Sequence, residues 1–577
     1  MTFPSTTSTP TGRFFRTALA TGAALFLGAC AQMGSPGGSI TDSMTSTETT
    51  QVSTYGMGQA QQRFSTLTQI NKSSVKNLVP VWNTSLDNSA NMSTQPLVVD
   101  GIMYVVTHNS TAAIDATTGR QLWRTQIDLP ADVAAMVCCG IQARGLAIKD
   151  GIIYRPTLDA HLQAMDAKDG KVLWQTKVAD YTKGFSITGA PLVANGVVMT
   201  GISGGEYNTR GFVRGYDPKT GKELWTRYTT TSPGEKGHET WNGNDNWKTG
   251  GATTWITGSY DPKLDLVFWG TGNGAPWNPQ MRAKGGDSLY ICSVIAMRPK
   301  TGELVWHYQF SPADPYDYDS VNEMVLGDVT VNGKTVNAVI NANRNGFFYV
   351  LDRATGKLMA ANQYAKKLNW ATGVDLATGR PIDTDMTRRF KAELVMKDDE
   401  VVWPTIVGSK NWQPISFDPT RKLAFVNGQN FGTTLKNINQ ELKLPAMFFG
   451  ADLSGWVEPE DGHRGFIAAI DPVTGKHVWD VPLVVPHWSG VMSTAGGLVF
   501  TGNLLGEFLA YDSDTGKQVW KFQTGSGISG MPITWERNGV QYITITSGAA
   551  SLYNAMLADP NLPVVPVGGS VWTFALR

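Results

Sequence analysis

Short runs of alternating apolar and polar residues, separated by tight turns, recur along the chain. In GFVRGYDPKTGKELW an alternating run ends at Asp217, a Pro-Lys-Thr-Gly turn follows, and a second run leads to Trp225. Alternation with a period of two predicts strands, and the glycine supplies the positive φ that such turns require. The pattern therefore predicts a series of β-hairpins.

The hairpins share one internal spacing, Asp-x-x-x-Gly-x-x-x-Trp. Two further copies are degenerate, because Arg298 replaces the aspartate in one and Ala360 replaces the tryptophan in the other. A hairpin cannot bury both of its faces alone, so the copies must stack on one another. We therefore predict an all-β fold, an eight-bladed β-propeller of four-stranded antiparallel sheets. The complete copies are Asp115/Gly119/Trp123, Asp166/Gly170/Trp174, Asp217/Gly221/Trp225, Asp471/Gly475/Trp479 and Asp512/Gly516/Trp520.

Two stretches outside the motif complete this prediction. The long interval between Asp352 and Asp471 must hold a blade without the motif, and SFDPTRKLAFVNG at 416–428 is its predicted hairpin. We also expect the strand around Val79-Pro80-Val81-Trp82 to pair with the terminal SVWTFALR and so close the ring.

Composition agrees with a strand-rich protein. The chain has 62 glycines and 19 tryptophans, and only 17% of its residues are charged, against about 25% in ordinary domains. Its formal net charge is zero, which gives no sign of binding to nucleic acid.

The first residues are typical of an export signal. Arg13 and Arg16 precede the short apolar run ALATGAALFL, and Leu27-Gly28-Ala29-Cys30 resembles a bacterial lipobox. The run is too short to span a membrane. We expect a lipoprotein signal peptide at 1–29, a lipidated flexible tether at 30–58 with the lipid on Cys30, and the propeller at 59–577. An ordinary signal peptide is the alternative.

Hard oxygen donors follow several glycine-rich turns. Asp317 and Asp319 stand two residues apart in SPADPYDYDSVNE, and Glu206 and Asn273 each follow an apolar strand. In an extended segment the two aspartates point the same way and reach one point. Carboxylates and amides suit Ca²⁺ or another hard cation rather than zinc. The alternative for each residue is a solvated turn.

Several further segments, taken in order, resemble the quinoprotein methanol and ethanol dehydrogenases, which depend on pyrroloquinoline quinone (PQQ). The matching segments are VCCGIQARGLA, SITGAP, SGGE, GGATTW, NRNGFFYVLDRATG, SKNWQP and HWSG. The resemblance implies a Cys138–Cys139 disulfide over one face of the quinone and Trp255 stacked on the other. It implies further cofactor contacts from Arg144, Thr188, Ser203, Gly204, Gly205, Arg344, Asn411 and Trp488, and metal ligands in Glu206, Asn273, Asp317 and Asp319.

The resemblance also implies a mechanism. Asp317 matches the base that takes the hydroxyl proton of a primary alcohol, while hydride passes to the quinone and leaves an aldehyde. Beside a cation, Asp317 is expected to have a low pKa. Asp319 matches the second aspartate of lanthanide-dependent members, so we expect a lanthanide ion, with Ca²⁺ as the alternative. Ser93 departs from the family, which has a glutamate there.

No Cys-x-x-Cys-His occurs, so the chain carries no covalent c-type haem. We therefore expect a separate cytochrome c as electron acceptor. From the export signal we expect the enzyme on the periplasmic side of a membrane. The outer membrane is favoured because Ala31, directly after the lipid-bearing cysteine, is not the aspartate that commonly signals retention in the inner membrane. The sequence leaves open whether the protein forms a homodimer. A second hypothesis is a non-catalytic propeller lipoprotein that serves as an outer-membrane assembly scaffold, because the same repeat builds such proteins. The two hypotheses differ in one respect: only the enzyme requires residues with catalytic or metal-binding chemistry on the inserts of the blades.

Overall fold

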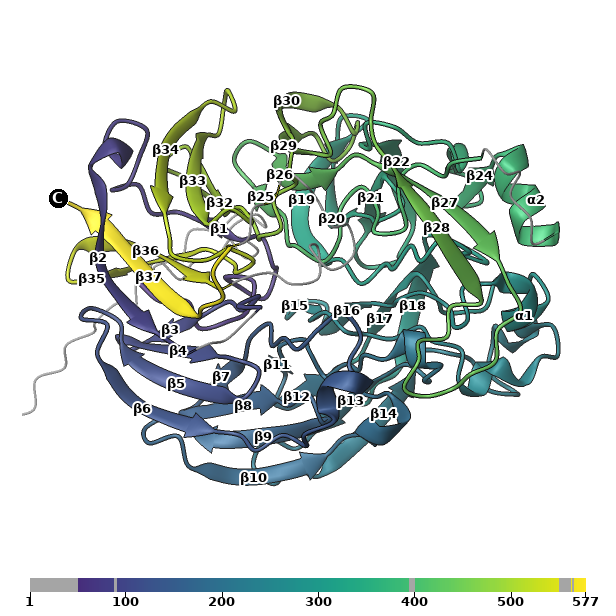
Figure 1. Ribbon diagram of the computed structural model, residues 1–577, viewed down its shortest axis with the longest axis horizontal. Coiled ribbons are helices and arrows are strands. Elements are labelled where there is room, and N and C mark those ends of the chain that lie inside the picture. Colours follow the sequence, from purple (N-terminus) through teal and green to yellow (C-terminus); the bar gives the residue numbers. More distant parts are fainter. Residues whose placement is uncertain (1–49, 88–90, 394–399, 549–561, 563–564) are drawn as a thin grey trace, which may run out of the picture. The chain divides into compact units, whose positions relative to one another are not determined.

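The alternating segments form eight sheets of four or five strands, which follow one another as blades around a ring (Figure 1). The structure is a computed structural model of the chain, and it describes residues 50–87, 91–393, 400–548, 562 and 565–577. All of these residues belong to one compact unit, Ile40–Arg577. The predicted eight-bladed propeller is confirmed.

In the first four blades the strands are consecutive in the chain. The first four blades are β3 (Leu97–Val99), β4 (Ile102–Val106), β5 (Ser110–Asp115) and β6 (Gln121–Gln126); β7 (Ala147–Lys149), β8 (Ile152–Pro156), β9 (His161–Asp166) and β10 (Val172–Lys177); β11 (Leu192–Ala194), β12 (Val197–Thr200), β13 (Phe212–Tyr216) and β14 (Glu223–Tyr228); and β15 (Ser259–Asp261), β16 (Leu266–Gly270), β17 (Ser293–Met297) and β18 (Leu304–Gln309).

The remaining blades carry the long inserts and the closure. They are β19 (Val325–Val331), β20 (Lys334–Ala342), β21 (Phe347–Asp352) and β22 (Leu358–Gln363); β25 (Ser416–Asp418), β26 (Leu423–Gln429), β29 (Gly465–Ile470) and β30 (His477–Leu483); β31 (Met492–Thr494), β32 (Leu498–Gly502), β33 (Glu507–Asp512) and β34 (Gln518–Gln523), with β1 (Phe64–Ser65) added in parallel; and β35 (Ile533–Arg537), β36 (Val540–Ser547), β37 (Ser570–Leu576) and β2 (Leu78–Ser85).

The repeated motif joins each blade to the next. Asp217 Oδ1 accepts hydrogen bonds from two backbone N–H groups of its own turn, at 3.0 and 2.8 Å. Trp174 of the preceding blade packs against Gly221, and its Nε1 donates to the Pro218 carbonyl at 3.1 Å. The motif tryptophan therefore stabilises the turn of the following blade. The same bond is made by Trp82, Trp123, Trp225 and Trp479, whereas Trp520 Nε1 donates to the Leu78 carbonyl at the start of β2.

The degenerate copy at Ala360 keeps the joint by another route. Asn362 Nδ2 donates to the Val473 carbonyl at 2.7 Å, and Gly475 packs against the backbone of Gln363. An amide N–H thus replaces the indole N–H at the joint.

Both structural predictions outside the motif are confirmed. The hairpin at 416–428 is formed by β25 and β26, which pair antiparallel. β2 pairs antiparallel with β37 over the register Leu78↔Leu576 to Ser85↔Ser570, so one blade is built from the two ends of the described chain. Figure 1 shows these two strands side by side.

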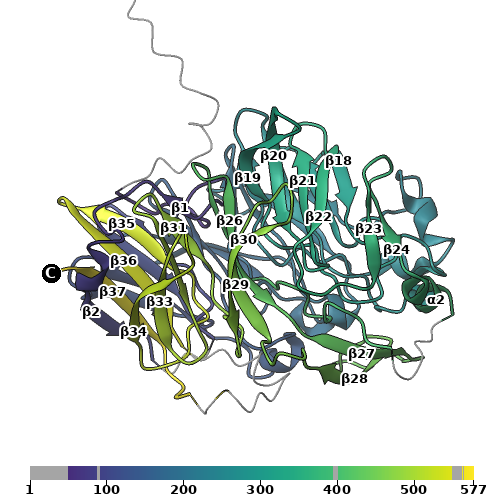
Figure 2. The same cartoon turned by 90° about the horizontal axis from the view of Figure 1, so that it is seen from above.

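Long inserts lie between the strands on one side of the ring. The hairpin of β23 (Ala371–Asp375) and β24 (Arg380–Asp383) leads into α2 (Asp385–Glu393), and the two views show β24 and α2 side by side (Figures 1 and 2). β27 (Gly432–Asn437) and β28 (Ala451–Val457) form a second hairpin. The helix α1 (Pro279–Ala283) lies in the connection between β16 and β17. No helix in the described part of the chain is long and apolar enough to cross a membrane.

The last residues of the predicted tether pack on the propeller. Val52 exchanges backbone hydrogen bonds with Val98 of β3 at 2.8 and 2.9 Å, and Tyr55 and Met57 are buried. The folded part therefore extends upstream of residue 59, its predicted start. The predicted signal peptide and Cys30 lie outside the described residues.

Candidate active site

The Asp-x-Asp pair lies on the loop between β18 and β19, where its two carboxylates converge. Asp317 Oδ2 lies 3.0 Å and Asp319 Oδ2 lies 3.1 Å from the same nitrogen, Arg344 Nη1. The expected extended segment is wrong, because Asp317 has a φ of +59°, in the left-handed region that few non-glycine residues adopt. The pair reaches one point, as predicted, through a local turn.

Two further predicted ligands lie beside the pair. Asn273 follows β16, and its backbone N–H donates to Asp319 Oδ1 at 2.7 Å. Glu206 follows β12 in a short 3₁₀ turn, η5 (Gly205–Tyr207). A Cβ atom on Gly205 would lie 3.1 Å from Asn273 Oδ1, so the glycine brings this turn close to Asn273. Four oxygen-bearing side chains from three blades therefore lie in one region.

The electrostatics of this region favour a cation. Burial raises the pKa of Asp317 well above its ordinary value; Arg344 opposes this effect and Asp319 adds to it. Burial also raises the pKa of Asp319, and burial together with Asp319 raises the pKa of Glu206 to about 7. Three carboxylates thus share one nearby guanidinium. A bound cation would favour their ionised forms and lower these pKa values.

The unpaired atoms identify where such an ion fits. In the described part of the chain, Asp317 Oδ1 and Asn273 Oδ1 are buried without hydrogen-bond partners. Among these same residues, no three His, Cys, Asp or Glu side chains are arranged so that they could hold a metal ion by themselves, and Arg344 contacts both aspartates. The two free oxygens and Glu206 nevertheless offer hard donors without displacing Arg344. The donor types and the excess negative charge fit a hard cation.

A pocket with a cavity volume of about 90 Å³ opens over the carboxylates. The predicted disulfide between Cys138 and Cys139 is present and lines this pocket. The pocket brings together nine of the eleven predicted cofactor contacts and three of the four predicted metal ligands. These residues are Cys138, Cys139, Arg144, Thr188, Ser203, Gly204, Glu206, Trp255, Asp317, Asp319, Arg344 and Asn411.

One wall of the pocket is a short polar chain beside two indoles. Arg144 Nη1 donates to Thr188 Oγ1 at 2.6 Å, and the Thr188 and Ser203 hydroxyls lie 3.0 Å apart. The Arg144 guanidinium lies 4.9 Å from the ring centroids of both Trp255 and Trp412. Burial lowers the pKa of Arg144 to about 10, so it stays charged at neutral pH. Its Nε lacks a partner among the described residues, so this wall fits a flat anionic ligand.

Some predicted residues lie behind the pocket rather than on it. Gly205 and Asn273 support the Glu206 turn, and Trp488 is buried in an apolar cluster with Trp412. Asn411 lines the pocket, but its amide donates to the Val407 carbonyl and its oxygen accepts the Trp412 N–H.

The sequence prediction missed three lining residues, Gln142, Val407 and Trp412. Only Trp412 had a signal, as an aromatic neighbour of Asn411 in SKNWQP. Ser93, the departure from the family, is buried away from the lining, and its hydroxyl bonds that of Ser529 at 3.2 Å.

Comparison with known proteins agrees with this geometry. The family model "PQQ: Glucose/ethanol/alcohol dehydrogenase, beta-propeller domain" matches residues 53–364 and 464–543. The quinoprotein alcohol dehydrogenase PedH of Pseudomonas putida is 40% identical over 551 residues, 91% of each chain. The lanthanide-dependent methanol dehydrogenase of Methylacidiphilum fumariolicum is 38% identical over 566 residues, 90% of this chain and 91% of the relative.

Among solved structures, a europium-containing methanol dehydrogenase superposes with a TM-score of 0.85 at 36% identity, covering 92% of this chain and 99% of the other. Both the sequence match and the fold match thus extend over nearly the whole propeller. The chain belongs to the family of PQQ-dependent alcohol dehydrogenases.

Proposed function

We propose that the protein oxidises a primary alcohol to an aldehyde, using PQQ together with a lanthanide ion. Membership of this family supports PQQ-dependent oxidation of an alcohol as the activity. The observation that supports the location of the site is a set of three carboxylates, with one unpaired aspartate oxygen, on the lining of a pocket that a disulfide also lines.

The residues divide the work by chemistry. Bound PQQ would accept the hydride, and the cation would polarise its carbonyl as a Lewis acid. Arg144 and the Thr188 and Ser203 hydroxyls would bind the anionic groups of the cofactor, because they provide charged and neutral N–H and O–H donors on one wall. Trp255 provides a flat apolar surface for a planar ring.

Asp317 would act as the base. Arg344 holds Asp317 Oδ2 at 3.0 Å, which leaves Oδ1 unpaired and the carboxylate on the pocket lining. An alcohol placed in the pocket would give its hydroxyl proton to the Asp317 carboxylate.

Asp319 supports the choice of a lanthanide. It adds a third carboxylate to a site that already holds Glu206 and Asp317, and a trivalent ion of about the size of calcium benefits from that extra charge. Two similar proteins are named as a lanthanide-dependent and a europium-containing methanol dehydrogenase.

The acceptor and the location complete the proposal. Because the sequence has no Cys-x-x-Cys-His, electrons would leave to a separate cytochrome c. Lipid on Cys30 would hold the enzyme on the periplasmic side of a membrane, with the outer membrane favoured. Cell fractionation of wild type and Cys30→Ser tests this point, and we expect the variant to leave the membrane fraction.

A dye-linked alcohol oxidation assay tests the function. Metal-free and PQQ-free protein is reconstituted with PQQ and either La³⁺ or Ca²⁺ and given a series of primary alcohols. We expect activity with La³⁺ to exceed activity with Ca²⁺. Activity with Ca²⁺ alone would overturn the metal assignment, and the absence of activity with either metal and every alcohol would favour the scaffold.

A further inference from the structure

The left-handed backbone at Asp317 is flanked by two fully buried tyrosines. Tyr316 and Tyr318 are both 0% exposed, and they alternate with the two aspartates. Asp317 has a φ of +59°, and a non-glycine residue persists in such a conformation only where its surroundings impose it. The contacts of the two tyrosines therefore show what holds Asp317 in place.

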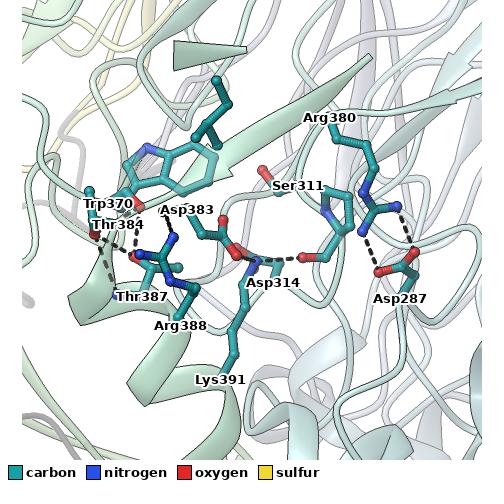
Figure 3. Close-up of polar contacts among 12 residues, drawn as sticks. Asp287, Ser311, Asp314, Trp370, Arg380, Asp383, Thr384, Thr387, Arg388 and Lys391 are labelled. Atoms are coloured by element: carbon teal, nitrogen blue, oxygen red, sulfur yellow. Dashed lines mark hydrogen bonds and ion pairs between the residues drawn. The ribbon is translucent and has the colours of Figure 1, made fainter. Parts of the chain in front are cut away.

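Tyr316 is held by α2. Its ring stacks on Phe390, with centroids 5.4 Å apart and planes 3° apart, and its hydroxyl lies 3.1 Å from Thr387 Oγ1. Thr387 donates its own hydroxyl proton to the Trp370 carbonyl at 2.7 Å, as Figure 3 shows. Because Thr387 has only one proton to give, Tyr316 is the donor in its bond to Thr387.

Tyr318 is held from the other side. Its hydroxyl donates to the Pro404 carbonyl at 2.7 Å, and its ring lies 5.6 Å from that of Trp370. Its backbone N–H donates to Asp314 Oδ2 at 2.9 Å. Tyr316 is therefore fixed to α2, and Tyr318 is fixed to Trp370, Pro404 and Asp314.

The same insert also reaches Arg344. Trp370 Nε1 donates to the carbonyl of Asn345 at 2.8 Å, directly after Arg344. At the end of α2, Lys391 Nζ bonds the Pro312 carbonyl at 2.9 Å and Asp383 at 2.8 Å, which ties α2 to the start of the aspartate loop. Both partners of the Arg344–Asp317 pair are thus attached to one insert.

We propose that Trp370, Thr387 and Phe390, here called the clamp, are positioning residues that set the placement of Asp317 and Asp319 relative to Arg344. This inference rests on the proposed function for its effect on turnover. None of the clamp residues lines the pocket, and they act through Tyr316, Tyr318 and Asn345.

The test compares two buried phenylalanines in the full-length holoenzyme. Phe390→Leu removes the stack on Tyr316, whereas Phe508→Leu makes the same change at a fully buried site in a different apolar cluster. Tyr316→Phe keeps the stack and loses only the bond to Thr387. For each variant, kcat, KM and Tm are measured, together with the affinity of the full-length metal-free protein for Tb³⁺ by luminescence.

We expect Phe390→Leu to lower kcat at least tenfold with KM within twofold of wild type, and to weaken Tb³⁺ binding at least tenfold. Phe508→Leu should leave both within twofold despite a similar loss of Tm, and Tyr316→Phe should fall between the two. Equal effects of Phe390→Leu and Phe508→Leu on kcat and on Tb³⁺ affinity would overturn the inference.

The readouts separate this inference from the proposed function. If wild type oxidises no alcohol but Phe390→Leu selectively weakens Tb³⁺ binding, the proposed function fails and the clamp stands. If wild type neither turns over nor binds Tb³⁺, both are overturned.

Discussion

Arg344 and Asp319 form a buried ion pair, with Arg344 Nη1 3.1 Å from Asp319 Oδ2. The arginine lies in the turn between β20 and β21, and the aspartate on the loop before β19. Arg344 also pairs with Asp317, so one guanidinium serves two carboxylates while Glu206 lies nearby. Buried charges require such compensation. Removal of Asp319 would leave two carboxylates, Asp317 and Glu206, beside the single Arg344 guanidinium.

Removal of Asp319 should therefore change the choice of metal. We expect Asp319→Ala to lower kcat with PQQ and La³⁺ at least tenfold, because a trivalent ion loses one of three negative groups. Activity with Ca²⁺ should fall less, so the ratio of the two activities decreases. Steady-state kinetics at saturating metal measures both.

Asp328→Ala is the matched control, because it also removes a buried carboxylate, but one on β19 that is bonded to Asn337 and absent from the pocket lining. Its activity ratio should equal that of wild type. An unchanged ratio in Asp319→Ala would falsify the lanthanide assignment.

The motif glycines offer a test of how the blades are joined. Gly221 has a φ of +67°, and a Cβ there would lie 2.5 Å from the Trp174 ring. Gly196 has a φ of +76°, but a Cβ there would meet no atom within 4 Å. Gly196→Ala should therefore cost only the backbone term of about 1–2 kcal/mol.

Gly221→Ala adds displacement of the indole and loss of its bond to Pro218, about 2 kcal/mol more. The free energy of unfolding from urea titration measures this difference. Equal losses in Gly196→Ala and Gly221→Ala would show that the tryptophan does not join the blades.

The sequence predicted the parts of the molecule that depend on local spacing. The turn, the glycine and the tryptophan of one blade lie within nine residues, and the contact of Trp174 with Gly221 repeats around the ring, so the motif predicts the fold. The pocket residues were found because short segments carry their chemistry. The turn at Asp317 and the stack of Tyr316 on Phe390 were not predictable, because they join distant segments without any periodic pattern.

The disulfide between Cys138 and Cys139 should matter for activity far more than for stability. It closes a loop of two adjacent residues, so it removes little entropy from the unfolded chain. It also lines the pocket. We expect the double variant Cys138→Ser, Cys139→Ser to lose at least tenfold in kcat/KM for the alcohol, with a Tm within about 2 °C of wild type.

Treatment with dithiothreitol should reproduce the loss in wild type and change nothing further in the double variant. Cys292 is free and buried, so Cys292→Ser should keep the sensitivity of wild type to the reductant. Full activity in the double variant would show that the disulfide has no role in the reaction.

His487 should make the folded protein sensitive to mild acid. It is buried, and burial lowers its pKa to about 4 from the ordinary 6.5. Its Nδ1 has no hydrogen-bond partner in the part of the chain that the structure describes. Between pH 6.5 and 4 the unfolded chain binds this proton and the folded protein does not. Stability therefore falls as the pH drops through this window, by about 2 kcal/mol at pH 5.

The variant His487→Gln removes this titration. The free energy of unfolding should drop between pH 7.5 and pH 5.0 by about 2 kcal/mol less in His487→Gln than in wild type. His463→Gln, at a partly exposed histidine, controls for the loss of a histidine as such and should behave like wild type. If wild type and His487→Gln lose equal stability over this range, the folded protein accommodates the charged imidazole, and the acid sensitivity must come from other groups.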